Sequence, residues 1–318
     1  MKILVTGGAG FIGSNFIRYM LDAHVGIDIV NMDSLTYAGN VNNLKGLETD
    51  PRYSFLKADI CDSHRVESAL PGTDAVIHFA AESHVDRSIT DPSGFVRTNV
   101  LGTHTLLECA KKCGISKFIH ISTDEVYGST MRGSFSETDH LHPSSPYSAS
   151  KAGSDLLALA YHTTFDLPVI VTRCTNNFGP YQFPEKLIPL FITNLIDDKK
   201  VPVYGSGKNV RDWIHVRDHC RAIDFLLTRG KAGEIYNIGG GNEKTNLEIT
   251  GQILKKLNKD TSMIEYVKDR RGHDFRYSLD CSKLRDMGWK PEYSFEKALD
   301  ETITWYEQNA WWWRPLRK

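Results

Sequence analysis

The chain has 318 residues, of which 41% are hydrophobic and 24% charged, values typical of a soluble globular protein with one large or two modest domains. Its formal net charge of -1, from 38 basic and 39 acidic residues, disfavours nucleic acid as a partner, because binding to phosphate backbones favours a basic surplus. No apolar run approaches the roughly 20 residues that span a membrane, and the sequence begins directly with KILVTG, so we expect a cytoplasmic protein.

Short apolar runs alternate with helical patterns along the first 174 residues. This alternation predicts an α/β fold, a Rossmann-type doubly wound parallel sheet with helices on both faces. The predicted strands are KILVTG, DIVNMD, SFLKADI, DAVIHFA, KFIHIS and PVIVTRC. The predicted helices include SNFIRYMLDA, THTLLECAKKCG and KAGSDLLALAYHTTF.

The composition of the sequence changes after about residue 174, where Pro, Gly and Asn become frequent. We therefore expect a first domain at residues 1–174 and a smaller C-terminal lobe at residues 175–318. Segments near 210–240, including the strand-like EIYNIGGG, are expected to return to the first domain. The C-terminal AWWWRPLRK is predicted to pack or to form an interface.

The six cysteines show no CxxC pair and no histidine at metal-ligand spacing, which disfavours a structural metal or a disulfide. Cys109 and Cys113 lie four residues apart on a predicted helix. We expect both to be buried or half-buried free thiols.

The segment VTGGAGFIGS places Gly7, Gly10 and Gly13 between a predicted strand and a predicted helix. Glycines let the backbone approach a pyrophosphate, and a helix N-terminus offers it free N–H groups and a positive dipole. Asp33 ends the next predicted strand, where a carboxylate accepts from a ribose 2′-OH and repels a 2′-phosphate. The alternative interpretation of Asp33 is a helix cap. The pattern predicts NAD as the cofactor, with Asp59 bordering its adenine.

A second group of reactive side chains follows later strands. Tyr147 and Lys151 lie four residues apart in PYSASKAG, so on a helix the ammonium can lie beside the phenol. A free tyrosine has a pKa of about 10, and a nearby Lys⁺ together with a cationic nicotinamide ring favours the phenolate.

The segment HISTDEVYGS ends a predicted strand with the hydroxyl of Thr123 and the adjacent carboxyls of Asp124 and Glu125. Two neighbouring carboxyls resist double ionisation, so one can serve as an acid beside a base. Adjacent strand residues point to opposite faces, so both carboxyls can reach one ligand only from the turn after the strand. Two solvated loop acids are the alternative.

These motifs resemble those of the extended short-chain dehydrogenase/reductase superfamily and, within it, the dTDP-glucose 4,6-dehydratases. The glycine turn and YxxxK indicate only the superfamily, whereas HFAAESHVDRSI with STDEVYG indicates the dehydratases. Related sugar-nucleotide epimerases lack the Asp-Glu pair. The similarity also extends through MDSLTYAGN, TNVLGT, TRCTNNFGPYQFPEKLIP, VYGSGKNVRDWIHVRDHCRAI, YNIGGGNEKTN and DRRGHDFRYSLD.

The resemblance implies a hydro-lyase that converts dTDP-glucose to dTDP-4-keto-6-deoxyglucose and water, moving a hydride from C4 to C6 through bound NAD. In such an enzyme Tyr147 takes the proton of O4, Thr123 hydrogen-bonds the same oxygen, and Lys151 supports the phenolate. Glu125 then removes the C5 proton, and Asp124 protonates the departing C6 hydroxyl. No metal is implied.

The resemblance also implies which residues hold the two ligands. The expected NAD contacts, besides Tyr147 and Lys151, are Gly7, Gly10, Phe11, Ile12, Gly13, Asp33, Ser34, Leu35, Thr36, Asp59, Ile60, Phe79, Ala80, Ala81, Glu82, Ser83, Thr98 and Asn177. The expected sugar-nucleotide contacts are Ser83, Thr123, Asn176, Lys186, Leu187, Pro202, Val203, Tyr204, Arg211, Asn246, Asp269, Arg270, Arg271, Gly272 and His273. Arg211, with Arg270 or His273, is the candidate for holding the diphosphate, since a guanidinium matches phosphate oxygens. His78 and His84 are expected in the core or behind the site rather than in catalysis.

Two other functions stay open at this point. One is another sugar-nucleotide enzyme of the same scaffold, such as a UDP- or CDP-sugar dehydratase, a 4-epimerase or a decarboxylase. The other is a catalytically silent NAD-binding module, although such a module has no need for all five catalytic side chains. A homodimer is expected, because family members commonly pair through helices of the first domain.

Overall fold

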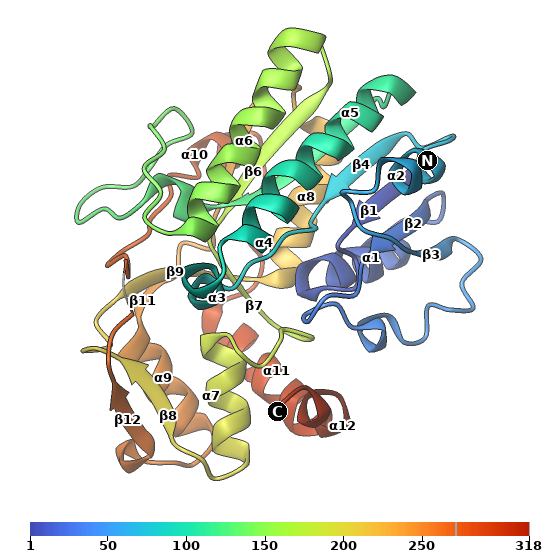
Figure 1. Ribbon diagram of the computed structural model, residues 1–318. Coiled ribbons are helices and arrows are strands. Elements are labelled where there is room, and N and C mark those ends of the chain that lie inside the picture. Colours follow the sequence, from blue (N-terminus) through green and yellow to red (C-terminus); the bar gives the residue numbers. More distant parts are fainter. Residues whose placement is uncertain (271, 318) are drawn as a thin grey trace.

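The computed structural model describes residues 1–270 and 272–317. Its largest element is a seven-stranded parallel sheet with the strand order β10-β6-β5-β4-β1-β2-β3 (Figure 1). The strands are β1 (Lys2–Thr6), β2 (Asp28–Asp33), β3 (Tyr53–Lys57), β4 (Ala75–His78), β5 (Lys117–Thr123), β6 (Val169–Cys174) and β10 (Ile235–Ile238). The predicted Rossmann-type sheet is therefore confirmed, including the strand that returns from the later sequence to pair with β6.

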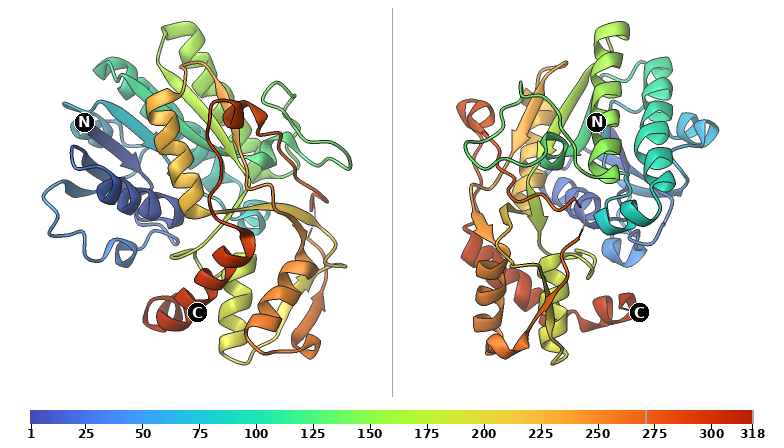
Figure 2. Two further views of the ribbon diagram at one scale, coloured as in Figure 1. Left: turned by 180° about the vertical axis from the view of Figure 1, so that it is seen from behind. Right: turned by 60° about the vertical axis from the view of Figure 1, so that its left-hand side comes forward.

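Helices cover both faces of this sheet (Figure 2). One face packs against α1 (Phe11–Ala23) and α8 (Val216–Arg229), which contact each other. The other packs against α2 (Ser63–Ala69), α5 (Thr103–Cys113) and α6 (Pro146–Phe165). Both faces are apolar, so the strands read as continuous hydrophobic runs rather than as alternating patterns.

The side chains of β1 show how the alternation of a strand divides the core. Ile3 and Val5 belong to the cluster on the α1 and α8 side, whereas Leu4 between them belongs to the cluster on the α5 and α6 side. All three side chains are fully buried. The sheet is thus fixed on both faces, and its carboxyl ends present the loops that form the site.

A second lobe packs below the carboxyl ends of the large sheet in Figure 1. Its own core joins helices and a two-stranded parallel sheet, β8 (Val201–Tyr204) and β12 (Ile264–Val267). The helices are α7 (Leu187–Ile196), α9 (Asn246–Lys256), α11 (Phe295–Gln308) and α12 (Ala310–Trp313). Among the described residues, the remaining strands are β7 (Asn176–Phe178), β9 (Val210–His215) and β11 (Glu243–Thr245), which form a three-stranded sheet. The remaining α-helices are the short α3 (Val85–Thr90), α4 (Ser93–Phe95) and α10 (Ser282–Asp286).

The C-terminal aromatic segment packs into the protein, as one of the two interpretations predicts. Trp312 and Trp313 are buried in the core of the second lobe, whereas Trp311 is half exposed. The indole nitrogen of Trp312 donates a 2.7 Å hydrogen bond to the side-chain oxygen of Asn43 in the first lobe. The segment therefore helps to join the lobes.

The six cysteines are free thiols. Cys109 is buried as expected, but the expectation for Cys113 is wrong, because that side chain is exposed at the last turn of α5. Within the described residues, no group of three or more histidine, cysteine or acidic side chains is arranged to hold a metal ion. None of the helices in this part of the chain combines the length and the apolar character that a membrane crossing requires.

Candidate active site

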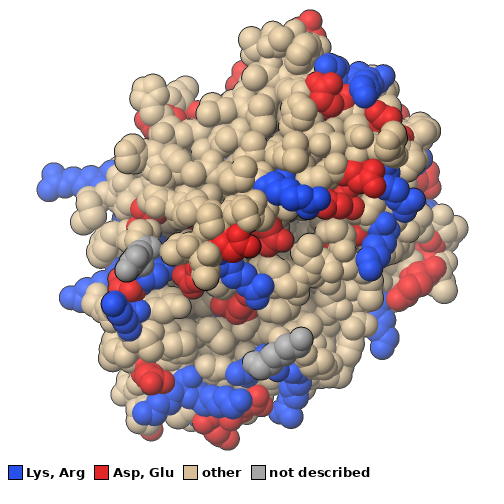
Figure 3. Space-filling model, in the orientation of Figure 1, with Lys and Arg blue, Asp and Glu red and all other residues tan. Residues whose placement is uncertain are grey.

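The loops at the carboxyl ends of the sheet and the facing second lobe enclose a cavity of about 660 Å³. This volume lies within the range of sites for small ligands and cofactors. Charged side chains of both signs surround the hollow between the lobes (Figure 3). Ligand sites of doubly wound sheets lie at this edge because all parallel strands end there.

The glycine turn after β1 leaves the backbone open to the cavity. Gly7 has a φ of 72°, and a Cβ atom there would lie 2.6 Å from the backbone nitrogen of Ala80. A Cβ atom on Gly13 would lie 2.4 Å from the carbonyl oxygen of Gly7. Helix α1 begins at Phe11 with no side-chain cap, so its first N–H groups are free to bind a phosphate.

Asp33 at the end of β2 is held in place by two backbone N–H groups. One carboxylate oxygen accepts from Ala9 at 2.9 Å and the other from Leu35 at 2.8 Å. Burial raises the pKa of Asp33, and the two hydrogen bonds oppose that shift. Asp33 lines the cavity at a strand end and caps no helix, so the helix-cap interpretation does not hold. These features fit the ribose of NAD beside the glycine turn.

Most of the predicted ligand-binding residues meet at this cavity. From the NAD set, the lining includes Gly7, Gly10, Phe11, Ile12, Gly13, Asp33, Ser34, Thr36, Asp59, Ile60, Phe79, Ala80, Ala81, Glu82, Ser83, Thr98, Tyr147, Lys151 and Asn177. From the sugar-nucleotide set, it includes Ser83, Thr123, Asn176, Lys186, Leu187, Pro202, Val203, Tyr204, Arg211, Asn246, Arg270 and His273.

Three predicted residues do not line the cavity. Leu35 has a φ of 56°, and its side chain packs against the core on the α1 side of the sheet. Asp269 accepts a 2.6 Å hydrogen bond from Nδ1 of His273, and Gly272 forms a turn with a φ of 63°. The predicted Arg271 lies outside the described residues.

The Thr-Asp-Glu segment lies where strand β5 ends and a 3₁₀ turn begins. The hydroxyl of Thr123 accepts from the backbone nitrogen of Glu125 at 3.3 Å and donates to Oδ1 of Asp124 at 3.2 Å. Asp124 is 3% exposed, so the alternative of two solvated loop acids does not hold. Among the described residues, the buried Oδ2 of Asp124 has no hydrogen-bond partner. Both carboxyls line the cavity, because the turn overrides the alternation of a strand.

The two carboxyls differ in their electrostatic surroundings. Burial, and then the neighbouring Glu125, raise the pKa of Asp124 well above its ordinary value. Burial also raises the pKa of Glu125, but the positive charges of Arg270, Lys186 and Arg211 oppose that shift. Asp124 is therefore the stronger candidate for a protonated acid, and Glu125 for an ionised base.

Tyr147 and Lys151 both lie on α6, whose start is fixed by a capping box between Ser145 and Ser148. The Lys151 ammonium donates a 2.7 Å hydrogen bond to the carbonyl oxygen of Ile121, and burial lowers its pKa to about 8. Burial, and then Glu125, raise the pKa of Tyr147 well above 10. The expected opposing effect of Lys151 and of the cationic nicotinamide ring on this pKa stays a prediction for the protein with NAD bound.

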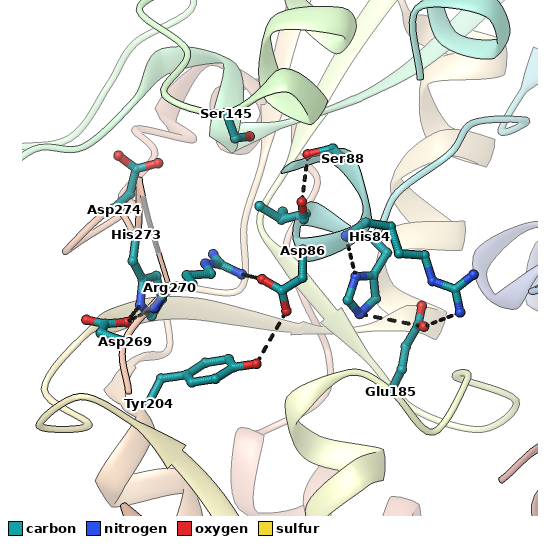
Figure 4. Close-up of polar contacts among 12 residues, drawn as sticks. His84, Asp86, Ser88, Ser145, Glu185, Tyr204, Asp269, Arg270, His273 and Asp274 are labelled. Carbon is teal, nitrogen blue, oxygen red and sulfur yellow. Dashed lines mark hydrogen bonds and ion pairs between the residues drawn. The ribbon is translucent and has the colours of Figure 1, made fainter. Parts of the chain in front are cut away.

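Positive side chains of the second lobe face the same cavity. Lys186 Nζ donates to the carbonyl oxygen of Ser83 at 2.8 Å, which joins the two lobes. The guanidinium of Arg211 lies 4.2 Å from the ring centroid of Tyr277. Arg270 lies 3.9 Å from Asp86, close to His273 (Figure 4). Lys186, Arg211 and Arg270 thus provide the cations that a diphosphate requires.

Known proteins match the chain over nearly its whole length. The family model described as GDP-mannose 4,6 dehydratase matches residues 4–302. A dTDP-glucose 4,6-dehydratase from Streptomyces niveus is 54% identical over 100% of this chain and 96% of its own length. One from Escherichia coli is 48% identical over 99% of this chain and 96% of its own length.

Solved structures agree with these matches. The dTDP-glucose 4,6-dehydratase from Streptomyces venezuelae, solved with NAD and dTDP bound, superposes with a TM-score of 0.97 at 54% identity over 100% of both chains. The chain belongs to the sugar-nucleotide dehydratase family of the extended short-chain dehydrogenases/reductases. A UDP-glucose 4-epimerase from Thermus thermophilus, solved with NAD, shares only 29% identity at a TM-score of 0.89 over 96% of this chain.

Several residues that line the cavity of this dehydratase-family chain were not predicted. They include His84, Val85, Asp86, Arg97, Gln182, Phe183, Glu185, Trp213 and Tyr277. The residues at 84–86 directly follow the predicted FAAES contacts after β4, so their place at the carboxyl end of a strand was a usable signal. Tyr277 and Trp213 come from the second lobe, where no sequence periodicity indicates which side chains face the sheet.

The two histidines of the DAVIHFAAESH segment have different surroundings in this family member. His78 is fully buried and hydrogen-bonded to the hydroxyls of Thr6 and Thr103, so it is a core residue as expected. His84 lines the cavity and accepts from the backbone nitrogen of Arg87 at 3.3 Å, which caps α3. Burial lowers the pKa of His84 to about 4, so its ring is neutral at neutral pH.

Proposed function

We propose that this chain is a dTDP-glucose 4,6-dehydratase that forms dTDP-4-keto-6-deoxyglucose and water with NAD held in its cavity. The observation that carries the proposal is the buried Asp124 beside Glu125 in the same cavity as Tyr147. An epimerase needs only the removal and return of a hydride, whereas loss of water requires one more acid and one more base. Full-length similarity to dTDP-glucose 4,6-dehydratases supports the same substrate.

The residues of the chain fit NAD at one end of the cavity. Gly7 and Gly13 provide a turn that a Cβ atom would obstruct, and Asp33 provides the ribose acceptor. When bound, NAD accepts a hydride from C4 of the sugar and later returns it to C6. The first domain, residues 1–174 with returning segments near 210–240, would bind the cofactor, and residues 175–318 mainly the sugar nucleotide.

Tyr147, Thr123 and Lys151 act in the oxidation at C4. Tyr147 removes the proton of O4, while the Thr123 hydroxyl donates a hydrogen bond to the same oxygen. Lys151 and the cationic ring of the cofactor oppose the effect of burial on Tyr147 and stabilise its phenolate. Loss of the O4 proton and oxidation at C4 produce a ketone, which acidifies the proton on C5.

The carboxyl pair carries out the elimination. Glu125, surrounded by Lys186, Arg211 and Arg270, removes the C5 proton. Asp124, kept protonated by burial and by Glu125, delivers its proton to the departing C6 hydroxyl. Water leaves across C5 and C6, and C5 is reprotonated at the end of the cycle.

Mass spectrometry of sugar nucleotides tests this function directly. Purified protein is incubated without added NAD with dTDP-, UDP-, GDP- or CDP-glucose. We expect the loss of one water from dTDP-glucose alone. Water loss from another nucleotide would keep the chemistry and overturn the substrate, whereas no mass change with NAD demonstrably bound would favour the epimerase or the silent module.

We also propose that two copies of the chain pair through the first domain. A shallow apolar groove is formed by side chains of α4, of the π-helical segment Val96–Gly102, of α5 and of α6: Ser93, Val96, Arg97, Val100, Leu101, His104 and Leu157. Val96, Leu101 and Leu156 are each at least half exposed in a single chain. A second copy placed on this face would cover them. Sedimentation equilibrium of the wild-type protein and of Leu101→Glu tests the pairing, and a wild-type monomer would overturn it.

A cytoplasmic location of the protein stays a prediction.

A further inference from the structure

Glu185 lines the cavity and is contacted by two residues from separate segments, Tyr37 and Arg87. Glu185, in the turn before α7, accepts a 3.0 Å hydrogen bond from the phenol oxygen of Tyr37. Its other carboxylate oxygen accepts from Arg87 on α3 at 3.4 Å. The guanidinium of Arg87 lies over the ring of Tyr37, 3.6 Å from its centroid. We call Tyr37, Arg87 and Glu185 the Glu185 clasp.

The clasp joins segments that line different sides of the cavity. Tyr37 belongs to the segment after β2, in which Asp33, Ser34, Thr36, Ala38 and Gly39 line the cavity. Residues 84–86, directly before Arg87, also line the cavity, as do Gln182, Phe183, Lys186 and Leu187 around Glu185. Phe183 lines the cavity and packs edge-on against the Tyr37 ring, with centroids 5.7 Å apart. The clasp therefore bridges the cofactor-binding segment of the first domain to the second lobe.

The contacts of Glu185 are stronger than those of an exposed ion pair. Its side chain is only 15% exposed, although Arg87 is half exposed. Burial, and then the charge of Glu185, raise the pKa of Tyr37 far above 10, so its phenol stays a hydrogen-bond donor at neutral pH. A hydrogen bond from a neutral donor to a partly buried carboxylate is among the stronger polar contacts in proteins. His84, shown beside Glu185 in Figure 4, lies 3.6 Å from the same carboxylate.

The neighbouring residue on α3 faces the substrate side and is held more loosely. Asp86 accepts from the phenol of Tyr204 at 3.4 Å and lies 3.9 Å from Arg270 (Figure 4). Within the described part of the chain, Asp86 Oδ1 and Arg270 Nε are buried without a hydrogen-bond partner. Consecutive residues of α3 thus join two groups of contacts: Arg87 contacts Glu185, whose shortest hydrogen bond is 3.0 Å, and Asp86 contacts Tyr204 and Arg270, with a shortest distance of 3.4 Å.

We propose that the Glu185 clasp keeps the cofactor in the cavity between the two halves of each turnover. This inference rests on the proposed function, since an enzyme that reuses one cofactor within a turnover fails if the reduced cofactor leaves midway. Movement of the Tyr37 segment away from the second lobe breaks both the hydrogen bond to Glu185 and the stacking with Arg87. The looser contacts of Asp86 let the sugar nucleotide exchange while the clasp stays closed.

The rate of cofactor release tests the clasp without any sugar nucleotide. Protein purified with NAD bound is diluted, and the NAD that passes an ultrafiltration membrane is measured over time. We expect release to be about tenfold faster from Tyr37→Phe, which loses only the phenol oxygen, and faster also from Arg87→Met. Tyr19→Phe is the matched control, because Tyr19 makes a 3.0 Å hydrogen bond to Asp224 outside the cavity lining. Release at the wild-type rate from both Tyr37→Phe and Arg87→Met would overturn the proposal.

A second readout follows the cofactor during turnover. With dTDP-glucose and no added NAD, Tyr37→Phe is expected to stop early, with reduced cofactor and unfinished 4-keto nucleotide in the filtrate, and added NAD is expected to restore product formation. Melting temperatures equal to that of the wild type would exclude unfolding as the cause. The two failures are distinguishable: a wild-type protein without water loss contradicts the proposed function, whereas equal release rates contradict the clasp.

Discussion

The ammonium of Lys151 donates a 2.7 Å hydrogen bond to the carbonyl oxygen of Ile121. This contact ties helix α6 to strand β5 in the interior of the protein, where Lys151 is 4% exposed. Tyr147 lies one turn before Lys151, and Thr123 lies two residues after Ile121. The bond therefore holds the helix that carries the proposed phenolate beside the strand that delivers the carboxyl pair.

The pH dependence of activity tests the role of Lys151. Burial lowers its pKa to about 8, and the cationic ring of bound NAD lowers it further, so Lys151 loses its charge above that pH. Since the charged form supports the phenolate, we expect kcat/KM to fall on the alkaline side with an apparent pKa no higher than about 8. In Lys151→Arg the guanidinium stays charged, so this alkaline limb should disappear even where the rate is lower. A limb that persists unchanged in Lys151→Arg would assign it to another group.

Replacing Tyr147 with phenylalanine removes the proposed base while keeping the aromatic ring. We expect the rate of product formation to fall roughly 10²- to 10⁴-fold, the range for loss of an acid–base group. Bound NAD should stay, because the glycine turn and Asp33 are untouched. Initial rates and the NAD content of denatured protein measure the two effects. Unchanged turnover would refute the proposed mechanism.

Asp124→Asn keeps the shape of the acid but leaves no proton to donate to the C6 hydroxyl. We expect water loss to slow roughly 10²- to 10⁴-fold while oxidation at C4 still occurs, so absorbance of the reduced nicotinamide should build up. Rapid mixing with substrate distinguishes these steps. A variant with normal water loss would show that Asp124 is not the acid.

The same variant changes stability with a predictable sign. The folded-state pKa of Asp124 lies above its unfolded value, so Asp124 favours the folded state below the unfolded pKa of about 4, and that contribution is lost as pH rises through the folded pKa. Asp124→Asn does not lose this stability as pH rises, because its side chain carries no ionisable proton. We expect its melting temperature to exceed that of the wild type at high pH and the difference to shrink toward pH values of about 4. A constant difference across pH would contradict the burial argument.

The glycine turn is expected to tolerate no side chain at Gly13. A Cβ atom there would lie 2.4 Å from the Gly7 carbonyl oxygen and 2.8 Å from the Gly8 Cα, both of them backbone atoms that cannot rotate away. Gly13→Ala should therefore lose bound NAD and lower the melting temperature. Gly26→Ala is the matched control, since a Cβ atom there meets no atom within 4 Å. Bound NAD at the wild-type level in Gly13→Ala would show that the turn can adjust.

The local sequence determined the elements and most of the cofactor end of the site. Buried strands that alternate with amphipathic helices leave few alternatives to a parallel sheet, and the carboxyl ends of its strands then lie at one edge. For this reason the sequence alone predicts that Gly13, Asp33 and Thr123 lie at one site. Each of these residues lies at the end of a strand or in the turn after it, and the neighbouring residues in the sequence are enough to predict that strand or turn.

Only the tertiary structure decided how the second lobe closes the cavity and what each titratable group experiences. Glu185 and Tyr277 come from segments without a diagnostic period, and their approach to the cavity depends on packing between residues far apart in the chain. Burial, and then the charge of Glu125, raise the pKa of Tyr147, and the spacing of Tyr147 and Lys151 along the chain reveals neither effect. Spacing along a helix predicts which side chains share a face. Desolvation of a titratable group, however, depends on every residue that packs around it, and those neighbours are known only from the complete fold.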